Sequence, residues 1–207
     1  MITSDIIARF ELYVDDGTEL STSEELDLAN KIYKMVCNYR PWEFLKTTFT
    51  GTQTAGVITL PTDFGYLCNN AQSTDSSVAQ NYETAPKVIY LGTTMTPVRI
   101  INWSDRRQYL NQNVAYVDLT DSTIKFIQTP TDTAVEFDYI KVPDDLILNS
   151  APIFPSRFHD IIYHGMAYDD FAIQLFDKAR SYANENKAKY DSLLRDMGYW
   201  NAQSFNN

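Results

Sequence analysis

The sequence is poor in the residues that build chemical sites. Its 207 residues include two cysteines, two histidines and seven scattered glycines, and they contain no phosphate-loop, dinucleotide-binding or G-x-S-x-G motif. Cys37 and Cys68 lie far apart without CxxC spacing. A disulfide framework and a paired-cysteine metal site are therefore excluded, and we expect reduced, packed thiols in a chain that folds in a cytosol.

The remaining candidates for catalysis or metal binding are also weak. His159 and His164 are five residues apart, which separates them by about 140° around a helix, whereas metal-binding pairs on a helix are three or four residues apart. Asp169 and Asp170 are adjacent and diverge by about 100° on a helix, so they predict a solvated face and not an acid–base pair. We therefore expect no catalytic residue, no metal and no cofactor, and a protein that is not an enzyme.

Long hydrophobic runs and basic clusters are also missing. No apolar run approaches the length of a membrane span, and Met1–Asp5 do not resemble the start of a signal peptide. The net charge is −10, and residues 1–30 are strongly acidic. Such a chain repels phosphate, so we expect no sequence-specific recognition of nucleic acid, although DNA could still slide past it. Arg106-Arg107 is read as the end of a surface helix or as a contact for an acidic neighbouring subunit.

What the chain does contain is apolar and aromatic. Hydrophobic residues make up 44% of it, which predicts a globular protein, and fourteen tyrosines are present. Tyrosine is rigid and amphipathic, so it suits both half-buried strand faces and protein interfaces. Composition alone leaves both interpretations open.

Helical patterns occupy the two ends of the chain. A first helix is predicted after Thr3, its candidate cap, with an apolar stripe from Ile6 to Val14 and an end at residues 15–18. The capping-box pattern at Ser21–Glu25 starts a second helix that is apolar on two sides and ends before Pro41. The helical period returns after Pro155, with Gly165 predicting a close helix–helix approach. It continues to Gly198, a C-cap signal. Near residues 176–178, a helical hairpin and one long helix are both open.

The middle of the chain reads as β-structure. A hairpin is predicted between residues 47–50 and 57–60, and a tight turn at 120–123 joins two further strands. A long exposed loop is expected at 69–85 and a short helix at 103–110. Besides the hairpin, strands are expected at residues 87–91, 98–101, 114–119, 124–127 and 135–140, and the turn at 120–123 joins the third and fourth of these.

Together these patterns predict an α+β fold in which a bundle of about four helices is interrupted by an inserted antiparallel β domain. The bundle takes residues 1–46 and 153–198, the β domain residues 47–152, and the C-terminal tail residues 199–207. The segments Arg40–Leu45 and Phe154–Asp160 mark the two junctions. The residues expected to form the joint between the domains are Trp42, Phe44, Leu45, Phe154 and Phe158.

The tail is aromatic in an otherwise polar sequence. Tyr199, Trp200 and Phe205 are three large rings within nine residues, and such rings at a chain end need a surface to cover them. They either fold back on the helices of their own chain or dock into a partner protein.

Several segments, taken in order, carry a resemblance to a known family. They are Arg40-Pro41-Trp42-Glu43-Phe44-Leu45, Leu60-Pro61-Thr62-Asp63-Phe64, Ile124–Ile127 with Pro130, Val135–Tyr139 with Pro143 and Leu146, and Phe154-Pro155 leading to Gly165-Met166-Ala167. Their order and spacing resemble the head–tail adaptor (head-to-tail connector) proteins of short-tailed bacteriophages.

The resemblance implies a structural virion protein that forms a ring of about twelve copies on the portal and joins it to the tail. The implied partners are the portal protein, a tail tube or nozzle protein, other copies of the chain, and double-stranded DNA that passes without sequence recognition; no membrane is involved. The implied location is the neck of the virion, after assembly in the host cytoplasm. Tyr199, Trp200 and Phe205 are then expected to bind the portal. The alternative is a stand-alone binding module whose tyrosine-rich β domain recognises carbohydrate or a receptor.

Overall fold

The structure is a computed structural model that describes residues 1–14, 20–68, 87–173 and 178–204. The chain divides into two compact units. The helical unit comprises Met1–Leu45 and Pro143–Asn207, and the sheet unit comprises Lys46–Val142. The exposed loop predicted at 69–85 lies outside the described residues.

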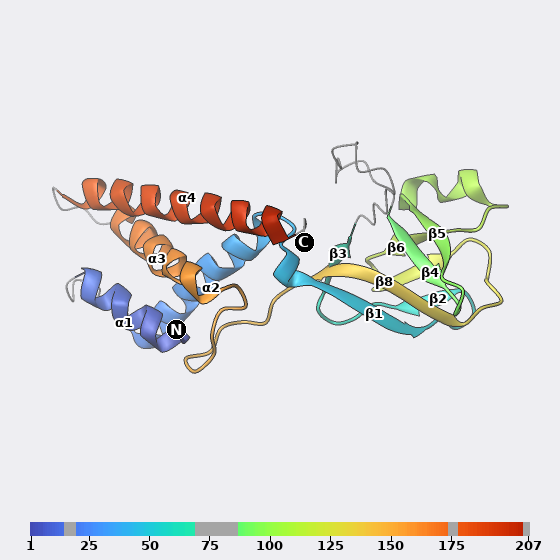
Figure 1. The fold of residues 1–207 in the computed structure, drawn as a ribbon, viewed down its shortest axis with the longest axis horizontal. Helices are drawn as coiled ribbons and strands as arrows, with labels where there is room; N and C mark the ends of the chain where they lie inside the picture. Colours follow the sequence, from blue (N-terminus) through green and yellow to red (C-terminus); the bar gives the residue numbers. More distant parts are fainter. Residues whose placement is uncertain (15–19, 69–86, 174–177, 205–207) are drawn as a thin grey trace. The chain divides into compact units, whose positions relative to one another are not determined.

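The helical unit contains α1 (Thr3–Val14), α2 (Thr22–Asn38), α3 (Asp160–Ile173) and α4 (Ala179–Ser204), with short 3-10 turns η1 (Glu43–Leu45) and η3 (Ser156–Phe158) (Figure 1). The predicted capping box is confirmed at the start of α2. The Ser21 hydroxyl accepts a hydrogen bond from the Glu24 N–H at 3.4 Å, and the Glu24 carboxylate accepts one from the Ser21 N–H at 2.8 Å. Two N–H groups that the helix itself leaves unpaired are thereby satisfied.

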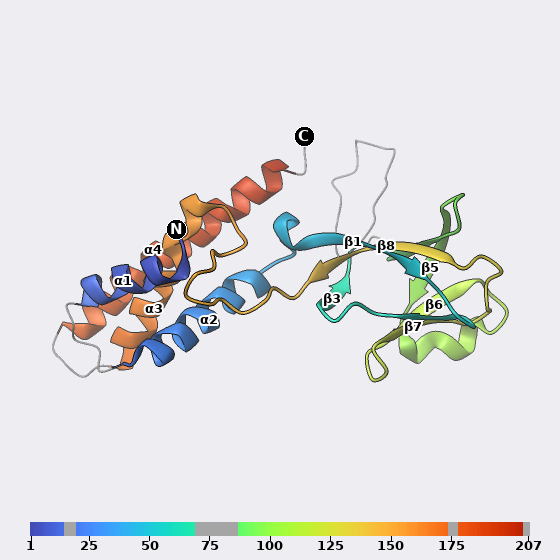
Figure 2. The same cartoon turned by 90° about the horizontal axis from the view of Figure 1, so that it is seen from below.

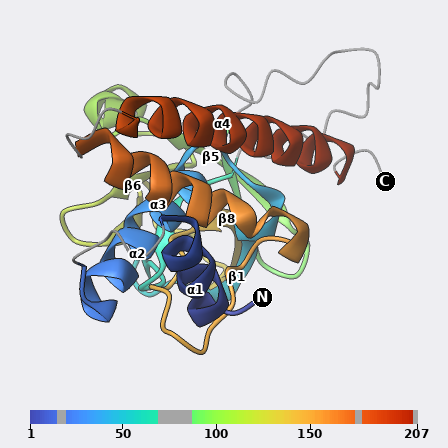
Figure 3. The same cartoon turned by 90° about the vertical axis from the view of Figure 1, so that its left-hand side faces the viewer.

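Helix α3 is the centre of the helical unit, because α1, α2 and α4 all pack against it (Figure 3). Gly165 of α3 permits this. A Cβ atom placed there would lie under 3.0 Å from the Cγ2 of Ile32 on α2 and 3.2 Å from the Tyr190 ring on α4. The predicted close helix–helix approach is therefore confirmed, and at Gly165 it involves α2 and α4.

The last part of the chain forms two packed helices, α3 and α4, so the helical hairpin is the correct alternative. Gly198 does not end α4, as its C-cap signal predicted, because the helix continues to Ser204. Gly198 has a packing role instead. A Cβ at position 198 would lie 2.8 Å from Nη1 of Arg40, so glycine leaves room for that guanidinium beside the helix.

The sheet unit, drawn in Figure 1 and Figure 2, holds one eight-stranded sheet. Its hydrogen-bonded order is β1-β8-β4-β5-β6-β7-β2, with β3 also paired to β8. The strands are β1 (Lys46–Thr52), β2 (Val57–Thr59), β3 (Phe64–Leu67), β4 (Val88–Leu91), β5 (Thr96–Ile101), β6 (Val114–Asp118), β7 (Thr123–Phe126) and β8 (Ala134–Lys141). The first and last strands of this order, β1 and β2, are consecutive in sequence and joined by a tight turn. The sheet is therefore nearly closed and barrel-like.

The predicted hairpin between residues 47–50 and 57–60 is wrong as a pairing, because β1 pairs with β8 and β2 pairs with β7. Gln53, which is only 5% exposed, explains the separation of the two strands. Its side-chain amide donates to the carbonyls of Pro130 at 3.1 Å and Asp132 at 3.0 Å, and its Oε1 accepts from the Gly56 N–H at 2.7 Å. The turn is thus fixed to the loop before β8.

The interior of the sheet unit is a single apolar cluster contributed by most of its strands. Phe137 of β8 stacks on Phe49 of β1 at 4.8 Å between ring centroids, and it lies 6.1 Å from Tyr139. The buried members of the cluster are Ile58, Leu60, Leu67, Ile89, Leu91, Val98, Ala115, Ile124, Phe126, Val135, Phe137 and Tyr139. Alternate residues of the strands face this cluster, as the period of two predicts.

One neighbouring pair of strands, β5 and β6, is parallel. The chain must therefore return to the starting end of β5 before β6 can begin. Residues 102–113 make this return, and they contain the 3-10 helix η2 (Trp103–Tyr109). The short helix predicted at 103–110 is confirmed.

The predicted fold class, a bundle of about four helices interrupted by an inserted antiparallel β domain, is wrong. The β part is a nearly closed eight-stranded sheet with a parallel pair. The helices do not form a four-helix bundle around a common core, because α4 makes its main contact with α3 alone. The class is a mostly β barrel-like fold with flanking helices.

Candidate functional site

The residues predicted to form a joint lie together inside the helical unit. Trp42 is fully buried, its indole N–H donates to the Val36 carbonyl at 2.7 Å, and its ring stacks on Phe44 at 5.5 Å. Phe44 in turn lies 5.9 Å from Phe154. Leu45 is buried as well. These contacts pack the segment that follows α2 against the rest of the helical unit, while a role in joining the two units stays a prediction.

The C-terminal end of α4 is fixed to this aromatic segment. The Glu43 N–H donates to the buried Asn201 side-chain oxygen at 2.8 Å, and the Arg40 guanidinium lies 3.4 Å from the Gly198 carbonyl oxygen. Without these contacts the end of a long helix would fray, because its last carbonyl groups have no partner within the helix. The last turns of α4 are therefore held in one position.

The two aromatic residues of this helix end have different surroundings. Trp200 is half-buried, with its ring 6.0 Å from the Phe158 ring and 5.3 Å from the Arg157 guanidinium. Tyr199 is 65% exposed. Phe205 lies outside the described residues. Trp200 therefore packs on its own chain, whereas most of Tyr199 is left accessible to a partner.

Two arginines border these rings. Arg40 lies 5.4 Å from the Trp42 ring and 5.8 Å from Tyr39, and Arg157 lies 4.8 Å from Phe158. Neither guanidinium has an ion-pair partner among the described residues. Tyr39 is 59% exposed. We call Tyr39, Arg40, Arg157, Tyr199 and Trp200 the C-terminal aromatic surface.

Sequence reasoning identified Tyr199 and Trp200 but missed Tyr39, Arg40 and Arg157 as parts of the same surface. A signal was present, because Arg40 and Arg157 belong to the two junction segments. The two segments are more than a hundred residues apart in sequence. Folding places Arg40 beside Gly198 and Arg157 beside Trp200, at the end of α4. The exposed tyrosines and arginines of this surface are residue types enriched in protein–protein interfaces.

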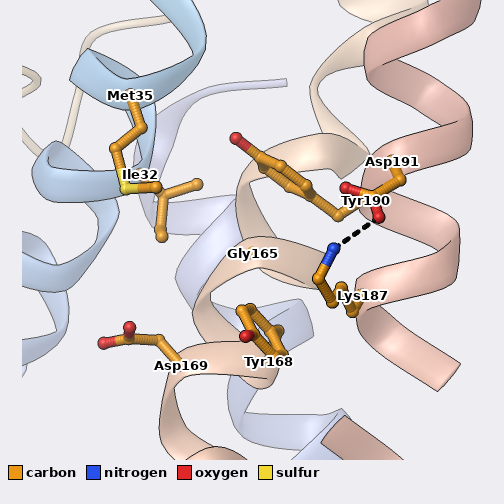
Figure 4. Close-up of a pocket in the computed structure, with 8 residues that line it drawn as sticks. All are labelled: Ile32, Met35, Gly165, Tyr168, Asp169, Lys187, Tyr190 and Asp191. Carbon is orange, nitrogen blue, oxygen red and sulfur yellow. Dashed lines mark hydrogen bonds and ion pairs between the residues drawn. The ribbon is translucent and has the colours of Figure 1, made fainter. Parts of the chain in front are cut away.

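A hollow of about 190 Å³ lies between α2, α3 and α4, over Gly165 (Figure 4). Ile32, Met35, Tyr168 and Tyr190 supply apolar walls, and Lys187 and Asp191 form an ion pair of 2.6 Å at its rim. Asp169, the other carboxylate of the lining, pairs with Lys31 at 2.7 Å. Both carboxylates are thus already occupied by lysines of the same chain, and the hollow presents no group set up for catalysis.

A carboxyl pair joins α1 to α2. Glu25 is buried, and this burial, together with the nearby Glu11 carboxyl to which it is hydrogen-bonded, raises the pKa of Glu25 to about 7. Desolvation disfavours a charged carboxylate, and a second negative charge adds to that effect. With a pKa near 7, Glu25 is partly protonated around neutral pH.

The two histidines have structural contacts. The ring nitrogens of His159 lie 3.0 Å from the Met1 carbonyl oxygen and 2.9 Å from that of Phe154. His164 is bonded to the Asn186 side chain at 2.9 Å, and burial lowers its pKa. Across the described ranges, no group of three or more histidine, cysteine or acidic side chains is placed to hold a metal ion.

Within the same described ranges, no helix has both the length and the apolar character needed to cross a membrane.

Comparison with known proteins gives one family match for this chain. The family model described as SU10 adaptor protein matches residues 1–206. No curated protein matches the chain.

Proposed function

The chain belongs to the family of SU10 adaptor proteins, and from this membership we propose that it forms the ring that joins the portal of a bacteriophage to its tail. The resemblance to phage head–tail adaptors noted in the sequence is confirmed at the level of the family. The protein is a structural component of the bacteriophage virion, and its family is not an enzyme family. Its position in the neck, its copy number and its contacts are parts of the proposal.

In this proposal the C-terminal aromatic surface binds the portal protein, together with Phe205. The observation that carries the proposal is the exposed Tyr199 ring on a helix end that Trp200 and Asn201 hold in place. Interfaces draw most of their affinity from a few tyrosine, tryptophan and arginine side chains. A group that is already ordered in the free protein loses less conformational entropy when it binds.

The sheet unit then contacts the next tail component, a tail tube or nozzle protein, and about twelve copies form the ring. The charge of the chain supports passage of DNA through that ring. Of the net charge of −10, the segments 1–45 and 143–207 carry −8, from ten basic and eighteen acidic residues. A channel wall of this sign repels phosphate, so that DNA slides without adhering.

The portal contact is tested with the full chain and the portal protein of the same phage. We expect Tyr199→Ala to weaken binding about tenfold or more, while the thermal unfolding of the adaptor stays unchanged because the ring is mostly exposed. The matched control is Tyr66→Ala, since Tyr66 is 44% exposed and lies in the sheet unit. Equal portal affinity for all three proteins would refute the assigned surface.

A further inference from the structure

The connection between β5 and β6 exposes a tryptophan and a leucine on the sheet unit. No residue of η2 is buried, and the Trp103 ring is 53% exposed. Leu110, directly after η2, is 64% exposed. An isolated exposed apolar side chain needs no explanation, but a tryptophan and a leucine on one protruding connection are typical of an interaction site.

The exposed tryptophan is held rigidly. The Arg106 guanidinium lies 3.5 Å from the centroid of the Trp103 ring, and its Nη1 donates to the Trp103 carbonyl at 2.7 Å. The cation–π contact and the hydrogen bond together hold the guanidinium over the ring. A rigid aromatic–cation unit can bind a partner at low cost in conformational entropy.

The same connection is basic within an acidic chain. Arg99, Arg106 and Arg107 have no ion-pair partner among the described residues, whereas Lys46 and Lys125 of the same unit pair with Asp138 and Asp118 at 3.1 and 2.9 Å. Asp105, the acid nearest to the arginines in sequence, is hydrogen-bonded instead to Ser104 at 3.2 Å. We call Trp103, Arg106, Arg107 and Leu110 the arginine–tryptophan platform.

The helical unit carries the complementary charge. On α1 and α2, Glu11, Glu24 and Asp27 are exposed, and in the described part of the chain none of them pairs with a lysine or arginine. Glu25, which hydrogen-bonds to Glu11, is itself buried and adds no exposed charge to this face. Arg9, the only base of the first thirty residues, is occupied by Asp160 at 2.8 Å.

We propose that the arginine–tryptophan platform of one copy docks on the acidic α1–α2 face of a second copy of this chain. Two different surfaces of one protein then meet, which is the contact that generates a ring when the rotation between copies closes. This inference rests on the proposed function, since that function requires copies to assemble side by side. The charges of the two faces set the pairing and the tryptophan supplies the buried anchor.

The test uses the full-length chain, whose mass in solution is followed by mass photometry over a range of concentrations, with and without the portal protein. Arg106→Glu/Arg107→Glu and, separately, Trp103→Ala are expected to shift assembly to concentrations about thirtyfold higher or more. Lys178→Glu/Arg180→Glu is the matched control, because it makes the same change in net charge at two exposed positions, one directly before α4 and one in its first turn. It is expected to assemble like the wild type.

Reversal of the second face provides the decisive arm. Adding Glu11→Lys/Asp27→Lys to Arg106→Glu/Arg107→Glu restores opposite signs across the contact, so assembly is expected to return. Wild-type assembly is also expected to weaken as salt rises from about 0.05 M to about 0.5 M.

The outcomes separate the two proposals. The docking inference would be overturned if Arg106→Glu/Arg107→Glu assembled at the same concentrations as the wild type. It would also be overturned if the quadruple variant stayed monomeric while circular dichroism showed it to be folded. Either result would leave the ring proposal standing. A wild-type chain that stays monomeric even on the portal would overturn the ring, and the inference with it.

Discussion

Gly165 offers the sharpest test of how the helical unit is packed. Replacing it by alanine adds one methyl group within α3, which by helix propensity alone stabilises the helix by about 1 kcal/mol. The new Cβ would, however, lie under 3.0 Å from the Cγ2 of Ile32 and 3.2 Å from the Tyr190 ring. Ile32 is 3% exposed and branched at its own Cβ, so its methyl group has little freedom to move away.

Overpacking of this kind costs about 1–3 kcal/mol, which outweighs the gain in propensity. We therefore expect Gly165→Ala to lower the free energy of unfolding by about 1 kcal/mol. In an Ile32→Ala background the clashing methyl is absent, and the same Gly165→Ala change should stabilise the protein by up to about 1 kcal/mol. The sign of the effect reverses, with a coupling free energy of about 2 kcal/mol between the two positions.

The measurement is urea unfolding followed by far-ultraviolet circular dichroism for the wild type, both single variants and the double variant. Gly198→Ala is the matched control. Gly198 also lies within a helix, but the atom nearest to its new Cβ is the movable guanidinium of Arg40 at 2.8 Å. Gly198→Ala should therefore leave stability unchanged or raise it. A Gly165→Ala change of the same size and sign in both Ile32 backgrounds would refute the packing described for α2 and α3.

Three further perturbations test other parts of the structure. Burial and Glu11 raise the pKa of Glu25 from 4.5 to about 7, so its stabilising contribution is full below pH 4.5 and is lost as the pH rises through 7. In pH-dependent urea unfolding, Glu25→Gln should be more stable than the wild type by about 3 kcal/mol near pH 8 and equal to it near pH 4. Trp200→Ala should lower the free energy of unfolding by about 2 kcal/mol, because it removes the contact with Phe158, and an unchanged thermal midpoint would contradict that contact. Gln53→Ala leaves two carbonyl groups and one N–H without their partner. We therefore expect the free energy of unfolding, measured by chemical denaturation, to fall by about 2–4 kcal/mol. An unchanged free energy of unfolding would show that other contacts hold the turn.

Local patterns in the sequence were sufficient for most individual elements. The start of α2 could be predicted because the Ser21–Glu24 capping box acts within four residues, and the β6–β7 pairing because a short turn connects its strands. The strand β3 was missed, since it has only four residues and one of them, Gly65, has no side chain to show a period.

The arrangement of those elements could not be predicted, because it depends on distant contacts. The tight turn between β1 and β2 suggested a hairpin. The side chain of Gln53 in that turn, however, bonds to Pro130 and Asp132, which lie 77 and 79 positions further along the chain, and the two strands pair with different partners. The C-cap signal of Gly198 was wrong, and the contact of that glycine with Arg40, 158 positions away, could not be seen in the sequence either.

The candidate site was found in part. Tyr199 and Trp200 stood out as large rings near the chain end, and the family of the chain confirms the resemblance to phage adaptors. Nothing in the sequence distinguished the exposed Tyr199 from the half-buried Trp200, because the difference arises from where Phe158 and Arg157 lie. The two arginines that complete the surface were missed for the same reason.

Copies of this chain are proposed to form a ring on the portal. The most direct test of that ring is the mass of the complex between the purified chain and the portal protein of its phage. Native mass spectrometry should show an added mass of about twelve copies, each of 23.8 kDa. A portal whose mass stays unchanged in the presence of excess adaptor would contradict the account.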